Sequence, residues 1–107
     1  GDTIQNFSAL PVRRVDRTAQ LAAGVDALEA IPRLQAAIAR IPNVAADPAP
    51  EVNLLDMNLL GPVISVRPYT HTSHYWQVYF DTNEAIIRVG REAGWPAPTP
   101  SQIERQA

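Results

Sequence analysis

Proline spacing constrains this chain more than any other feature of its sequence. Ten of the 107 residues are proline, and most of them lie between segments with a regular pattern of apolar residues. Proline fixes its own φ angle, donates no backbone hydrogen bond and disfavours helix in the residue before it. The chain is therefore divided into short elements, and no apolar run approaches the ~20 residues that cross a bilayer.

The N-terminal part has the pattern of strands. From Val12 the chain alternates, and between Val15 and Ala23 the positions of one parity are apolar apart from Arg17, as in a half-buried strand, until Gly24 breaks the pattern. Residues 3–8 have the composition of a further short strand. We expect one strand to begin at Val12 and to bury the side that carries Val15.

A hairpin is expected in the middle of the chain. Residues 43–50 read as a loop, and strands follow at about residues 52–57 and 63–69. The turn between them covers residues 58–62, with Gly61 at the bend.

The first helix is expected to begin at Asp26, which with Glu29 forms a capping-box-like start. Pro32 should kink this helix or move its start to a later residue, and Pro42 should end it. Five apolar residues at spacings of three or four predict its buried face: Leu28, Ile31, Leu34, Ile38 and Ile41.

The second helix is expected after a cap at Thr72 or Ser73, and it should end at Gly94, before Pro96. An aromatic cluster (Tyr75, Trp76, Tyr79 and Phe80) lies at helical spacing and is expected to be core, with the tyrosine hydroxyls at the rim. The predicted buried stripe and the residues that widen it are Tyr75, Tyr79, Ile86, Val89 and Ala93, with Trp76, Phe80 and Ile87.

The order strand, helix, strand, strand, helix predicts an α+β fold of the ferredoxin-like sandwich type, with two helices on one face of a small sheet. The fourth strand of that fold is missing or displaced into the extended C-terminal tail at residues 96–107. Such a tail has to find its partners elsewhere, for example on other subunits.

Composition excludes several functions. The net charge is −2, and all nine basic residues are scattered arginines apart from the pair Arg13 and Arg14. A nucleic-acid partner needs a basic face or stripe, so none is expected. The chain has no cysteine, which excludes disulfides, thiolate catalysis and cysteine-based zinc sites.

Two groups of side chains are candidate sites. His71 and His74 are spaced by three, but a zinc site needs three or four ligands, so a solvent-exposed helix start is favoured over a metal site. The carboxylates Asp81, Glu84 and Glu92 alternate with arginines on one helix, and a solvated helix face is favoured over a catalytic pair. No nucleophile elbow and no phosphate-binding glycine loop is present. We therefore expect no enzyme activity, no cofactor and no metal.

A longer string of residues resembles a known family. Residues 4–14 contain Ile-x-Asn-Phe-Ser followed by x-x-Pro-Val-Arg-Arg, which resembles the junction below the membrane in small-conductance mechanosensitive channels. Residues 47–52 resemble the Asp-Pro-x-Pro-x-Val before the hairpin of that family, and residues 94–98 its Gly-Ile-x-Pro-x-Pro tail. Tyr75-Trp76 with Phe80-Asp81 is similar to the aromatic start of its second helix.

The resemblance implies a division of the chain and a role. Residues 1–11 would be the end of a small β domain and the junction, residues 12–95 the cytoplasmic α/β domain, and residues 96–107 a tail or barrel strand. Family members are homo-oligomers, typically heptamers, in the inner membrane, and upstream helices that this chain lacks form the tension-gated pore. The chain would be a soluble piece of the cytoplasmic cage that serves assembly and coarse solute filtering during osmotic shock. Junction or intersubunit contacts are implied at Ile4, Asn6, Phe7, Arg13, Arg14 and Ile103.

Two other functions stay open at this point. The first is a small-molecule-binding regulatory domain of the ferredoxin-like fold, which requires a concave apolar pocket with converging polar groups. The second is a small enzyme that uses His71 and His74, which requires activity that is lost when either is replaced by alanine.

Overall fold

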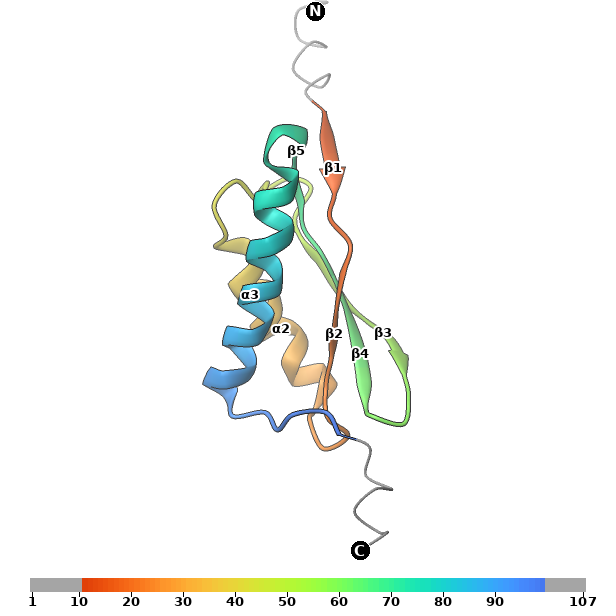
Figure 1. Cartoon of the computed structure of the whole chain (residues 1–107). Coiled ribbons are helices and arrows are strands. Elements are labelled where there is room, and N and C mark those ends of the chain that lie inside the picture. The colour runs from red at the N-terminus through yellow and green to blue at the C-terminus, as the bar shows by residue number, and fades with distance from the viewer. Residues whose placement is uncertain (1–10, 100–107) are drawn as a thin grey trace, which may run out of the picture.

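The computed structural model describes residues 11–99, and these form one α+β unit with two helices packed on one side of a twisted sheet (Figure 1). The strand predicted at residues 3–8, and the predicted contact residues Ile4, Asn6, Phe7 and Ile103, lie outside the described residues.

The main sheet has three antiparallel strands in the order β2–β4–β3: β2 (Arg17–Gln20), β4 (Pro62–Arg67) and β3 (Glu51–Met57). In chain order β2, β3 and β4 are the first, second and third strands of this sheet, so its first strand (β2) lies beside its third (β4). The first three strands of a ferredoxin-like sandwich have the same order. Apolar residues of one parity face the helices, and they form the sheet side of the core: Ala19, Val52, Ile64 and Val66.

The strand predicted from Val12 to Gly24 is two strands. β1 (Val12–Arg14) pairs antiparallel with β5 (Tyr69–His71) in a separate two-stranded sheet, while β2 joins the main sheet. The predicted strand at residues 63–69 is likewise divided between β4 and β5, at Pro68. Proline has no N–H to donate to a ladder, and at this point the chain keeps only a hydrogen bond from Val15 N to Pro68 O (2.8 Å).

The predicted hairpin is confirmed. The Asn58 side chain accepts hydrogen bonds from the N–H groups of Leu60 (2.9 Å) and Gly61 (3.1 Å), which closes the turn between β3 and β4. Gly61 has a φ of 144°, and a Cβ at this position would overlap the backbone of Leu21, so only glycine fits.

The first helix, α2 (Ala27–Ala39), begins after Asp26, whose carboxylate accepts from Leu28 N (3.0 Å) and Glu29 N (3.3 Å). The predicted cap by Asp26 is confirmed, but the hydrogen bonds of the described residues include none from Asp26 N to the Glu29 side chain, the other half of a capping box. The helix runs through Pro32 without a break and begins directly after its cap, so the expected delay is wrong. The predicted inward position of Leu28 is also wrong: it is 74% exposed, and the core takes Ala30, Leu34 and Ile38 from this helix.

The second helix, α3 (Tyr75–Ala93), follows a 3-10 turn, η1 (Thr72–His74). His71 provides the cap in place of Thr72 or Ser73: its Nδ1 accepts from Ser73 N at 3.0 Å. The end at Gly94 is confirmed, because φ is 75° there and Trp95 N donates back to Gly90 O at 2.9 Å.

The predicted buried stripe of α3 is confirmed only in part. Val89 is buried and the other four stripe residues are half-buried, whereas Trp76, Phe80 and Ile87, which were expected to widen the stripe, are exposed. The residues that α3 buries against α2 and β2 are short and recur at spacings of four and three: Val78, Thr82, Ala85 and Val89. Short side chains let a helix approach its neighbours closely, and this close approach leaves no room for aromatic rings.

Candidate functional surface

The outer face of α3 carries three large apolar residues that nothing in the described part of the chain covers. Trp76, Phe80 and Ile87 are 60%, 55% and 59% exposed. They lie within about 40° of one another around the helix axis, given 3.6 residues per turn. We call these three residues the α3 stripe. Their alignment points to a surface for a partner rather than to scattered exposed residues.

The rings at the start of the α3 stripe are arranged by one another. Trp76 stacks on Phe80 with 5.9 Å between ring centroids, and it lies 5.1 Å from Tyr79. Tyr75 meets Trp76 edge to face at 5.0 Å. Aromatic pairs of this kind contribute about 0.5–1.5 kcal/mol each, so the exposed rings are held in place before any partner arrives.

Two arginines border these rings on the side of the strands. The guanidinium of Arg13 lies 4.1 Å from the centroid of Tyr75, and that of Arg17 lies 4.4 Å from Tyr79. Arg17 also donates from Nη1 to Tyr79 Oη (2.7 Å) and from Nε to Asn83 Oδ1 (2.8 Å). These bonds explain the arginine at an otherwise apolar inward position of β2, because its side chain reaches α3 instead of the core.

The two predicted contact residues that the structure describes have different surroundings. Arg13 lies over Tyr75, whereas Arg14 forms an ion pair with Asp16 at 2.8 Å. The hydrogen bond and charge of Asp16 raise the pKa of Arg14 above its usual range. Within residues 11–99 the only other ion pair joins Arg67 to the same carboxylate, at 3.4 Å. Within residues 11–99 Arg13 thus has the Tyr75 ring as its neighbour and no ion pair, while Arg14 is paired with Asp16.

A second apolar surface lies on β3 and the turn after it, and it was missed in the sequence. Four residues there are exposed; we call them the hairpin surface, and they are Leu54, Leu55, Met57 and Leu59. β3 is one of the two edge strands of its three-stranded sheet, so one of its sides has no neighbouring strand in that sheet. The available signal was the run Leu54-Leu55, since adjacent residues of a strand point to opposite faces and only one of them can be core.

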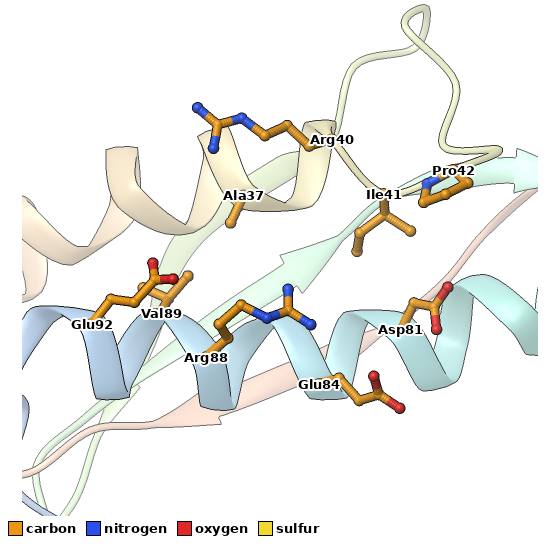
Figure 2. A pocket seen from close by; sticks show the side chains of 9 residues that line it. All are labelled: Ala37, Arg40, Ile41, Pro42, Asp81, Glu84, Arg88, Val89 and Glu92. Atoms are coloured by element: carbon orange, nitrogen blue, oxygen red, sulfur yellow. The ribbon is translucent and has the colours of Figure 1, made fainter.

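The charged residues of α3 line an open groove of about 330 Å³ between the two helices (Figure 2). Arg40 and Arg88 share it with three carboxylates, Asp81, Glu84 and Glu92. Glu84 and Glu92 are exposed, and Asp81 accepts a hydrogen bond from Gln77 (2.8 Å). Among the described residues, Glu84 and Arg88 form no ion pair within 4.0 Å. A groove of mixed, solvated charges gives none of the carboxylates the desolvated surroundings of a general acid.

The histidine pair has a structural role. His71 uses Nδ1 to cap the turn before α3, and the rings of His71 and His74 are 6.3 Å apart edge to face. Within residues 11–99 there is no group of three or more side chains that could hold a metal ion. The geometry thus provides surfaces for contact, and the described residues do not converge on a reacting centre.

Comparison with known proteins decides the family. The family model described as "Mechanosensitive ion channel MscS, C-terminal" matches residues 15–96, about three quarters of the chain. This chain belongs to that family. No curated protein matches the chain. The matched range includes β2, both helices, the hairpin and Trp95, so both exposed apolar surfaces are part of a mechanosensitive-channel domain.

Family membership confirms the resemblance and the α+β fold expected from the sequence. The family is one of channel domains and not a known class of enzymes. Neither helix in the described part of the chain is both long enough and apolar enough to cross a bilayer.

Proposed function

We propose that this chain is part of the cytoplasmic cage of a tension-gated channel, where it serves oligomer assembly and coarse solute filtering and contributes no pore. The family match over residues 15–96 carries the proposal. The cage would be built from copies of the chain, as a heptamer, on the cytoplasmic side of the inner membrane, below pore helices that precede the chain.

In this proposal the three parts of the chain have separate roles. Residues 1–11 are the junction to a preceding β domain, residues 12–95 form the cage wall, and residues 96–107 form a strand shared among subunits. The exposed α3 stripe and hairpin surface support a role in assembly, because large apolar side chains at a surface favour burial against a partner. Contacts at Ile4, Asn6, Phe7, Arg13, Arg14 and Ile103 belong to this proposal.

The first test reads the coding sequence upstream of Gly1. Several apolar stretches of membrane-spanning length followed by a β-rich segment would support the proposal. A start codon immediately before Gly1 would contradict it.

The second test measures currents. The complete coding sequence is expressed in cells without other mechanosensitive channels, and excised patches are stretched. We expect a tension-activated conductance, which removal of residues 12–95 abolishes by preventing assembly. Patches that stay silent under tension, although the intact protein reaches the membrane, would contradict the proposal.

One observation favours a second candidate, a small-molecule-binding module. An apolar hollow of about 300 Å³ lies between α3 and the chain after it, and Gln20 and Arg91 are the polar residues at its border. Thermal-shift screening of the chain against amino acids and nucleotides tests this candidate. A ligand that raises the melting temperature, and does so less in Trp95→Ala, would favour it over the cage.

A further inference from the structure

We propose that two copies of the chain associate head to tail, with the α3 stripe of one copy against the hairpin surface of the next. This inference rests on the proposed role in assembly and adds to it the two surfaces that meet. The partner is a second copy, and the contact is one that can repeat around a ring.

Helix α3 is apolar on two opposite faces. Its inner face is buried against the rest of the chain, as an amphipathic helix requires. Its outer face exposes more than half of Trp76 and Phe80, and aromatic side chains of about 150–250 Å² each then leave on the order of 200 Å² in water. A solvent-facing side of a helix is normally polar, so the α3 stripe requires a cover.

The α3 stripe and the hairpin surface lie at opposite edges of the molecule. The strand order is β2–β4–β3; α3 contacts β2 at one edge, and α2 contacts β3 at the other. Figure 1 shows α3 and β3 on opposite sides, with β2 and β4 between them. Two different surfaces on opposite sides cannot meet within one copy, but they can meet between neighbouring copies in a head-to-tail arrangement.

The two surfaces also match in length, direction and position along the molecule. By the rise per residue, α3 is about 28 Å long and β3 about 23 Å. Both run in the same direction, and the hairpin turn lies at the same end of the molecule as the C-terminal end of α3 (Figure 1). The α3 stripe ends there at the hollow bordered by Ile87, Gly90 and Trp95. A neighbour displaced sideways would thus bring its exposed Met57 and Leu59 to this hollow.

The charges around the two surfaces are largely of opposite sign. Residues 47–61, which contain β3 and the hairpin surface, carry three acidic residues and no basic residue. The α3 stripe is bordered by Arg13 and Arg17 on its strand side, and by exposed Arg88 and Arg91 on α3 itself, where Glu84 is the one carboxylate beside Ile87 among the described residues. Opposite charges around an apolar contact favour the head-to-tail pair over a pair of two α3 stripes, in which arginines would face arginines.

The geometry of β3 also indicates how it is contacted. Its register shifts between Leu54 and Asp56, which leaves Leu55 as the extra residue of a bulge. Bulges in edge strands disfavour the addition of a further strand. The hairpin surface therefore offers side chains, not backbone hydrogen bonds, to its partner.

Cysteine cross-linking tests the proposal directly, because the chain has no cysteine of its own. Ile87→Cys and Met57→Cys chains of different mass are mixed in equal amounts at up to ~1 mM, where weak association is populated, and are oxidised gently. We expect the mixed disulfide, which joins one chain of each variant, to exceed both same-variant disulfides well beyond the statistical excess of random pairing. A matched control replaces Ile87→Cys by Thr72→Cys, an exposed residue in the η1 turn that precedes the N-terminal end of α3.

Adding Phe80→Asp to the Ile87→Cys chain should lower the yield of the mixed disulfide by about tenfold or more, because an unpaired carboxylate would be buried in the contact. A predominance of the Ile87→Cys homodimer would show that two α3 stripes meet and would overturn the proposal. A mixed product no greater than that of the Thr72→Cys control would also overturn it. Since the chain is tested in solution without a membrane, this outcome would leave the upstream-sequence and patch-clamp tests of the channel role unaffected.

Discussion

The inner and outer faces of α3 differ in the size of their side chains, and the larger side chains are outside. The inner face consists of Val78, Thr82, Ala85 and Val89, whereas the outer face presents Trp76, Phe80 and Ile87. The inner residues let α3 lie close to α2 and β2, and protein interiors are packed too densely to admit larger groups there. The difference teaches that hydrophobicity identifies residues that need burial, while space inside the chain decides which of them are buried by the chain itself.

Replacing one apolar residue on each face by aspartate should give the largest difference in stability between the two faces. Val78 is fully buried, so Val78→Asp buries a charge without a partner and should cost at least ~4 kcal/mol of unfolding free energy, enough to unfold a small domain. Phe80→Asp, on the outer face, should leave the chain folded with a loss of about 0.5–1.5 kcal/mol, because it removes the stacking on Trp76 from a side chain that is already half in water. Circular dichroism during urea unfolding measures both. Equal losses in the two variants would show that the outer face is part of the core.

Added volume should also separate the two faces, with a smaller effect. Ala85→Leu inserts a larger side chain where only 1% of the residue is exposed, and we expect a loss of about 1–3 kcal/mol from overpacking. Its control, Ile87→Leu, keeps the volume on the exposed face and should change stability by less than about 0.5 kcal/mol. Denaturant midpoints at constant m-value report the difference. A stable Ala85→Leu chain would mean that the inner face has unfilled space.

The smallest expected effect is a gain in stability, on the inner face of α3. Thr82 Oγ1 is a buried side-chain oxygen without a hydrogen-bond partner within residues 11–99. Thr82→Val keeps the shape and removes the unpaired hydroxyl, so it should raise stability by about 1 kcal/mol. Val89→Thr is the reverse change on the same face and should destabilise. A thermal melt in which Thr82→Val unfolds at a lower temperature would indicate that the hydroxyl has a partner.

Local rules predicted much of the fold. The Asp26 cap, the hairpin with glycine at its bend and the helix end at Gly94 depend on residues within a few positions of each other, and all are present. The break at Pro68 was not predicted, although a proline can supply no ladder hydrogen bond, because nothing local shows that two short sheets would replace one long one.

The amino-acid sequence was enough to predict the start of α2, the hairpin turn, the end of α3, the α+β class and the family, since caps, turns and motifs are set by neighbouring residues. The tertiary structure alone decided which side of α3 is buried, why Arg17 can occupy an inward position, and where the exposed apolar surfaces lie. A residue's position in the helical repeat fixes the face of the helix on which it lies. Which face is buried depends on how close the neighbouring elements come, and that is a property of the tertiary structure. For α3 the apolar residues lie on both faces, so the pattern alone could not separate the face that is buried within the chain from the face that stays exposed.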